Sequence, residues 1–167
     1  MLIYHPAFDA YHCVFRMLLL IESLPETEID MLRLCDFYLV FPSEIEKIRL
    51  PSSLSRGRKI AKSFSNVYRN PINATQVFRD MTEIQLSALR SIAASGLIDI
   101  ECYERGIVRK FSTTKIPQSI LSKISEHLQK NHETTEFILN SLSKLPLRGL
   151  DGLKHRSGLL EYKYDTP

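Results

Sequence analysis

The chain has 167 residues, of which 44% are hydrophobic and 25% charged, and it carries a net charge of +3. These values are typical of a globular protein with one domain or two small ones, and they exclude disordered, collagen-like and disulfide-rich classes. Its apolar runs are far shorter than the roughly 20 residues of a membrane span, and no secretory leader pattern is recognisable, so we expect a cytoplasmic protein that does not enter a membrane. Three cysteines lie far apart among apolar residues and are expected to be reduced packing residues: Cys13, Cys35 and Cys102.

The positive charge is concentrated in one part of the chain. Residues 1–50 carry a net charge of −4, residues 51–80 carry +5, and residues 81–167 carry +2. A segment with such an excess of Lys and Arg is suited to contact phosphates or an acidic protein surface. Because residues 51–71 are also rich in Ser and contain Gly and Pro, we interpret them as a basic connector with one helical stretch.

Helical spacing of apolar residues dominates residues 1–50, which we expect to form an acidic helical module. A first helix is predicted from Pro6 to Leu24, and a second from Thr27, as its N-cap, to Val40. The second is apolar on more than one side, which indicates a central place in the core. A capping box in the residues that follow predicts a short third helix.

A winged-helix-like unit is predicted for residues 72–116. Its helix is expected to begin after a cap at Asn73 or Thr75 and to end before Gly96, a residue type that favours a left-handed C-cap. Apolar and polar residues then alternate on both sides of a turn, from residue 98 to residue 111, which predicts a β-hairpin. A helix that leads directly into a short hairpin is typical of a winged helix.

The last predicted segment, residues 117–167, contains a helix after Pro117, a break at Asn131-His132 and a further helix before Pro146, followed by a polar tail. The predicted fold class is therefore mainly α with a small β-hairpin, an α+β arrangement. We expect the four segments either as separate modules or as one compact domain.

Two groups of residues have the composition of metal sites. The first consists of four potential ligands within nine positions: His5, Asp9, His12 and Cys13. The alternative is that these residues cap and pack the first helix, since further ligands from elsewhere are not identifiable. The run from His132 to Glu136 is similar to the HExxH metalloprotease motif, but a glutamate replaces the second histidine. We expect no metal at either place.

The sequence contains no motif for common cofactor or catalytic chemistry. It lacks the GxxxxGK[ST] loop that binds ATP, the GxGxxG turn of Rossmann nucleotide sites and the GxSxG elbow of serine hydrolases. We therefore expect a protein that is not an enzyme and that needs no cofactor.

Binding is better supported than catalysis. The candidate nucleic-acid-binding residues are four cations of the connector and three near the predicted hairpin: Arg56, Arg58, Lys59, Lys62, Arg105, Arg109 and Lys110. Such cations neutralise backbone phosphates in a salt-sensitive mode that does not depend on sequence, with solvated surface charge as the alternative. The helix before the hairpin offers few side chains that read bases, so this unit is more similar to winged helices that dock to proteins.

The opening segment, from Met1 to Arg16 (MLIYHPAFDAYHCVFR), resembles the N-terminus of the middle components of bacterial ABC three-component defence systems. These are relatives of Lamassu, whose accessory subunit LmuC is similar. The resemblance covers mainly residues 1–45. It implies a non-enzymatic subunit that links an SMC-like or Rad50-like ABC ATPase to an effector, often a nuclease, in anti-phage or anti-plasmid immunity.

Six residues match the family-like segment and are expected to form either structure or a partner surface: His5, Phe8, Asp9, Tyr11, His12 and Arg16. Three functions follow as alternatives. We favour an assembly subunit of an SMC-like defence complex. The others are a winged-helix transcription regulator that binds DNA, and a metal-dependent enzyme built on the histidines and aspartate of this segment.

Overall fold

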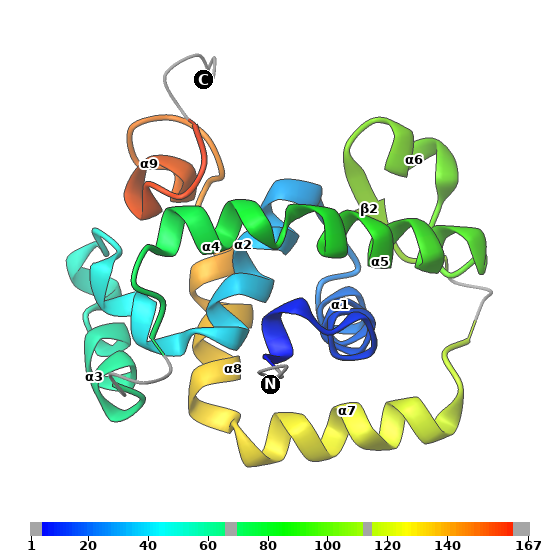
Figure 1. Cartoon of the computed structure of the whole chain (residues 1–167), viewed down its shortest axis with the longest axis horizontal. Helices are drawn as coiled ribbons and strands as arrows, with labels where there is room; N and C mark the ends of the chain where they lie inside the picture. The colour runs from blue at the N-terminus through cyan, green and yellow to red at the C-terminus, as the bar shows by residue number, and fades with distance from the viewer. Residues whose placement is uncertain (1–4, 66–69, 112–114, 162–167) are drawn as a thin grey trace.

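Helix α1 (Ala10–Ser23) lies in the centre of the fold. In the computed structural model, which describes residues 5–65, 70–111 and 115–161, α1 is seen nearly end-on, with α5 (Thr82–Ala94) above it and α7 (Gln118–Lys130) below (Figure 1). A short 3-10 turn, η1 (Pro6–Phe8), precedes α1. The predicted N-terminal helix is confirmed, with one interruption at Asp9.

Helix α2 (Ile29–Val40) is the most deeply buried helix segment, because every residue from Met31 to Tyr38 is buried. This confirms its predicted place in the core. The prediction of Thr27 as its N-cap is wrong, since Thr27 lies in strand β1 (Glu26–Glu28) and Glu28 occupies the cap position. Pairing of β1 with a distant strand, rather than local capping, sets the start of this helix.

The other helices surround these three. The remaining bounds are η2 (Pro42–Lys47), η3 (Ser52–Leu54), α3 (Arg56–Ser63), α4 (Ala74–Asp80), α8 (His132–Asn140), η4 (Leu142–Lys144) and α9 (Leu153–Ser157). One cluster of buried apolar side chains extends from Ala7 to Leu153 and includes residues of all four predicted segments. The predicted class, mainly helical with a small antiparallel sheet, is confirmed.

The predicted hairpin is wrong in its first arm. Residues Ile100–Glu104 form helix α6, because the Asp99 side chain accepts a hydrogen bond from the backbone N–H of Cys102 at 3.1 Å and so caps a helical turn. Strand β2 (Ile107–Arg109) pairs antiparallel with β1, and a single bridge joins Ile98 to Lys110. The wing expected between residues 98 and 111 is therefore replaced by a helix and a long-range strand pair.

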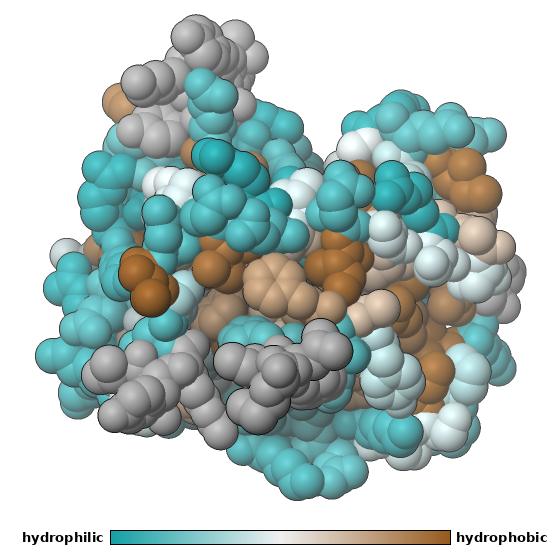
Figure 2. All heavy atoms as spheres, viewed as in Figure 1, coloured by the Kyte–Doolittle hydropathy of each residue, from teal (hydrophilic) through white to brown (hydrophobic). Residues whose placement is uncertain are grey.

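The surface of the face seen in Figure 1 is not uniform. Apolar side chains gather across its middle, whereas the lower edge beside α7 is hydrophilic (Figure 2). Exposed large apolar residues include Phe8, Tyr11 and Phe64. No helix in the described ranges is long and apolar enough to cross a membrane.

Candidate functional site

His5 and Asp9 serve the local structure of the N-terminal segment. The His5 ring nitrogen Nδ1 accepts a hydrogen bond from the backbone N–H of Ala7 at 3.1 Å, and the ring stacks on Phe41 with 5.4 Å between centroids. The Asp9 side chain accepts from the backbone N–H of His12 at 2.8 Å and is the N-cap of α1. The structure thus gives both residues the capping role that was the alternative to a metal site. No group of three His, Cys, Asp or Glu side chains suited to a metal occurs in the described part of the chain.

Phe8, Tyr11 and His12 of the same segment lie at the surface. Phe8 is 48% exposed and Tyr11 is 66% exposed, so both aromatic side chains present much of their area to solvent. The Tyr11 hydroxyl accepts a hydrogen bond from Lys123 of α7 at 3.4 Å. We call Phe8, Tyr11 and His12 the aromatic surface.

Arg16, the last of the six matched residues, is buried and belongs to the interior of the protein. Its Nε donates to Asp36 Oδ1 of α2 at 2.5 Å, and its Nη1 donates to the carbonyl of Pro6 at 2.9 Å. Asp36 is fully buried. Arg16 therefore ties η1 and α1 to α2 and takes the structural role rather than a place on a partner surface.

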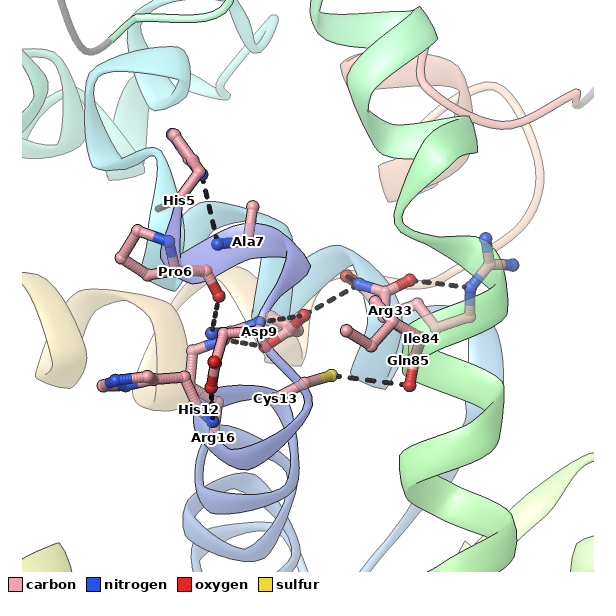
Figure 3. A network of polar contacts seen from close by, with 11 residues as sticks. His5, Pro6, Ala7, Asp9, His12, Cys13, Arg16, Arg33, Ile84 and Gln85 are labelled. Atoms are coloured by element: carbon pink, nitrogen blue, oxygen red, sulfur yellow. Dashed lines mark hydrogen bonds and ion pairs between the residues drawn. The ribbon is translucent and has the colours of Figure 1, made fainter. Parts of the chain in front are cut away.

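The contacts of Arg16 continue into a buried polar network across three helices. Gln85 of α5 donates to Asp36 Oδ2 at 2.8 Å, and its side-chain oxygen accepts from Arg33 Nε at 3.1 Å. Arg33 also donates to Thr82 Oγ1 at 2.8 Å. Figure 3 shows the labelled Arg16, Arg33 and Gln85 converging from α1, α2 and α5.

Two further charged residues, Asp30 and Lys154, extend this network. Arg33 forms an ion pair with Asp30 at 3.2 Å, and Lys154 of α9 contacts the other oxygen of Asp30, also at 3.2 Å. Buried charges are tolerated only when they are paired and hydrogen-bonded, and here their contacts join α1, α2, α5 and α9. Sequence reasoning missed Asp36 and Gln85. One feature of the sequence indicates such a network: a charged residue inside an otherwise apolar stretch, as at Arg16 and Asp36.

Two partly buried histidines, His5 and His127, are expected to make the folding stability depend on pH. Burial lowers the pKa of His5 and of His127, and the charge of Arg16 lowers both further. A histidine with a lowered pKa in the folded state binds its proton more readily in the unfolded state. We therefore expect the urea midpoint to fall as pH decreases below about 6.5, and His127→Gln to weaken this dependence. If the urea midpoint of the variant fell between pH 7.5 and pH 5.5 as steeply as that of the wild type, His127 would not contribute to the pH dependence.

Helix α3 packs one side against the rest of the protein and exposes basic residues on the other side. Gly57, Ile60 and Ala61 are buried on the side that packs against η2 and α8. A Cβ at Gly57 would lie 2.4 Å from the Phe137 ring, so only glycine allows this close approach. Three predicted cations remain exposed on the outer side and form what we call the α3 basic face: Arg58, Lys59 and Lys62.

The fourth cation of the connector has a different environment. Arg56 forms an ion pair with Glu136 at 2.9 Å, donates to the Ser141 hydroxyl at 3.0 Å and lies over the Phe137 ring. It thus holds α3 against α8. A further connector cation, Arg69, lies outside the described residues.

The three cations near the predicted hairpin are engaged within the chain. Arg109 makes two hydrogen bonds to the Glu26 carboxylate, at 2.8 and 3.2 Å, and Lys110 pairs with Glu22. Arg105 donates to the carbonyl of Glu101 at 3.2 Å. The structure therefore does not bring the seven predicted nucleic-acid-binding residues together into one surface, and the α3 basic face is the part of the set that is exposed as a group.

Comparison with known proteins identifies a family for the chain. The family model described as ABC-three component (ABC-3C) system Middle Component 5 matches residues 2–165, almost the whole length. No curated protein and no solved structure matches significantly. The chain belongs to the Middle Component 5 family and is a middle component of an ABC three-component system.

Proposed function

We propose that this middle component is a non-catalytic accessory subunit that links an SMC-like, Rad50-like ABC ATPase to a nuclease-type effector and regulates that effector in anti-phage or anti-plasmid defence. The family match over residues 2–165 carries the proposal, because a middle component works with the other components of its system. The similarity of the opening segment to the Lamassu accessory subunit and the lack of catalytic motifs in the sequence support it.

The aromatic surface is the proposed contact to a partner subunit. Phe8 and Tyr11 expose large apolar side chains, and aromatic residues of this kind are enriched at protein interfaces. Their neighbours, His5 and Asp9, fix the backbone of η1 and the start of α1. The aromatic side chains are therefore held by an ordered segment rather than by a free terminus.

The α3 basic face is the proposed contact to DNA within the assembled complex. Three exposed cations on one short, anchored helix suit phosphates and offer no base reading, so the contact is independent of sequence. The transcription-regulator alternative has less support, since helix α6 stands where its wing was expected and Arg109 and Lys110 are paired with glutamates.

Co-expression with the neighbouring genes tests the accessory role. The tagged chain is expected to co-purify with a long coiled-coil ATPase, and the double variant F8S/Y11S is expected to lose most of that partner because it removes exposed aromatic area. The matched control is I72S/L150S, which also removes two exposed apolar side chains. Equal recovery of the ATPase with both variants would exclude the aromatic surface, and absence of any ATPase with the wild type would overturn the accessory role.

Charge reversal tests the DNA contact of α3. In the assembled complex, R58E/K59E/K62E is expected to weaken duplex binding and to make the slope of log affinity against log salt shallower by about 2 to 3, the amount expected for three phosphate contacts. Arg56 is left in place because it pairs with Glu136. The control R90E/K115E/K144E changes the net charge equally at other exposed positions. Unchanged affinity with the α3 variant would show that its cations are solvated surface.

A further inference from the structure

A cavity of about 350 Å³ lies beside the C-terminal end of α3. The end of α2, the start of η2, the last residues of α3 and the junction between α7 and α8 form its walls. Its lining contains serine, threonine and asparagine side chains and one histidine next to apolar groups, and no Asp, Glu, Lys or Arg among the described lining residues. We call it the α8 cavity. The described part of the lining is polar and uncharged, which favours a neutral group that makes hydrogen bonds over a phosphate or a carboxylate.

Thr134 gives the α8 cavity an unused hydrogen-bonding group. This residue lines the cavity and is 5% exposed, and its hydroxyl has no hydrogen-bond partner among the described residues. A buried hydroxyl without a partner destabilises the fold, because it has lost its hydrogen bonds to water. An occupant of the cavity would supply the missing partner.

The start of α8 adds further donors at the same place. Asn131 occupies the N-cap position, but its side chain makes no capping hydrogen bond and instead donates to the carbonyl of His127 at 3.2 Å. The first backbone N–H groups of α8 therefore have no side-chain cap. His127 itself lines the cavity, and its lowered pKa favours the neutral ring, which offers one donor and one acceptor.

Aromatic residues complete the chemical character of the cavity. Phe41 and Phe64 both contribute to its lining, and Phe64 is 41% exposed. A flat ring that carries hydrogen-bonding edges fits a cavity with aromatic walls and uncharged polar groups. The nucleobases have this chemistry, and the cavity volume lies at the lower end of small-molecule sites, as a single nucleoside requires.

The α3 basic face adjoins this cavity along the chain. Lys62 is exposed, and the next three residues, Ser63 to Ser65, belong to the cavity lining. Proteins that bind single strands combine a positive surface for the backbone with aromatic and polar sites for bases. The two features occur here on one short helix and the residues that follow it.

We propose that the α8 cavity binds an unpaired nucleobase of a DNA strand whose phosphates lie on the α3 basic face. The inference rests on the proposed DNA contact of α3 and makes it more specific, since it directs the subunit toward DNA with a single-stranded part. Lys59 and Lys62 hold the backbone, while Thr134 and His127 offer hydrogen bonds to the edge of the base.

The experiment compares two DNA ligands on the assembled complex by fluorescence anisotropy: a blunt duplex, and the same duplex with a short single-stranded overhang. The wild type is expected to bind the overhang ligand roughly tenfold more tightly, the amount that stacking of one base commonly provides. Thr134→Val keeps the size of the side chain and removes the hydroxyl, so it is expected to reduce the preference several-fold. Ser65→Trp, at an exposed lining position, is expected to fill the cavity and abolish the preference. Neither variant should change the affinity for the blunt duplex.

The outcomes separate this inference from the function on which it rests. If R58E/K59E/K62E weakens binding of both ligands while the wild type shows no preference for the overhang, the cavity proposal is overturned and the DNA contact of α3 stands. A preference that survives both Thr134→Val and Ser65→Trp also overturns it. If R58E/K59E/K62E changes neither ligand, the proposed DNA contact itself fails.

Discussion

Replacing Asp36 with alanine is expected to lower the free energy of unfolding by about 3–5 kcal/mol, the usual result of removing one partner from a buried ion pair. Asp36 is fully buried and accepts hydrogen bonds from Arg16 at 2.5 Å and from Gln85 at 2.8 Å. Its removal leaves the Arg16 guanidinium charged and without its carboxylate in the core. Urea unfolding followed by circular dichroism measures the loss.

Two further variants show whether the effect comes from the unpaired charge. Glu26→Ala breaks the exposed pair with Arg109 and is expected to cost much less, because water and salt screen that pair. The double variant R16M/D36L removes both charges and is expected to be more stable than Asp36→Ala alone. A loss for Asp36→Ala as small as that for Glu26→Ala would show that the network contributes little to stability.

Gly57→Val is expected to lower the free energy of unfolding by about 1–3 kcal/mol, the cost of inserting atoms into a packed contact. An added Cβ would meet the Phe137 ring at 2.4 Å and Leu50 at 2.9 Å, so either these packed side chains or α3 itself must shift. A shift of α3 would also strain the contact of Arg56 with Glu136. Chemical unfolding gives the free energy, and the salt slope of DNA binding by the complex reports the displaced α3 basic face.

A double-mutant cycle with Phe137→Leu isolates the steric contact. Leucine lacks the ring atoms that approach Gly57 most closely, so the valine variant is expected to be better tolerated in its presence. Lys59→Val is the matched control, because it places the same side chain on the exposed side of the same helix. Equal costs for the two valine variants, or strictly additive losses in the cycle, would rule out the close approach as the cause.

Local signals in the sequence predict most helix ends correctly. Asn73 caps α4 through a hydrogen bond from the backbone N–H of Gln76 at 3.0 Å, and Gly96 has the positive φ expected after α5. The break between α7 and α8 falls at Asn131. These features depend on residues within a few positions of one another, and a single sequence contains that information.

Two causes explain the elements that are predicted incorrectly from the sequence: pairing between distant segments, and competition between local signals. The alternation from Ile98 favoured a strand, but the cap at Asp99 stabilises a helical turn, and nothing in residues 98–111 reveals that strand β2 pairs with β1. The partner of Arg16 lies 20 positions away on another helix, so sequence spacing did not identify it. The ion pair with Glu136, 80 positions away, separates Arg56 from the three cations of the α3 basic face, although all four are close in sequence.

The pairing of β1 with β2 also affects how the protein folds during synthesis. Glu26 and Arg109 are 83 positions apart, so the ribosome releases β1 long before its partner strand exists. Until then the backbone groups of β1 have no neighbouring strand, and the first turn of α2 lacks the hydrogen bond from Ile29 to the carbonyl of Gly106. The buried cluster also includes Leu153, so the nascent chain completes its core only after that residue has been translated. Assembly with a partner subunit that requires the finished core is delayed until the same point of synthesis.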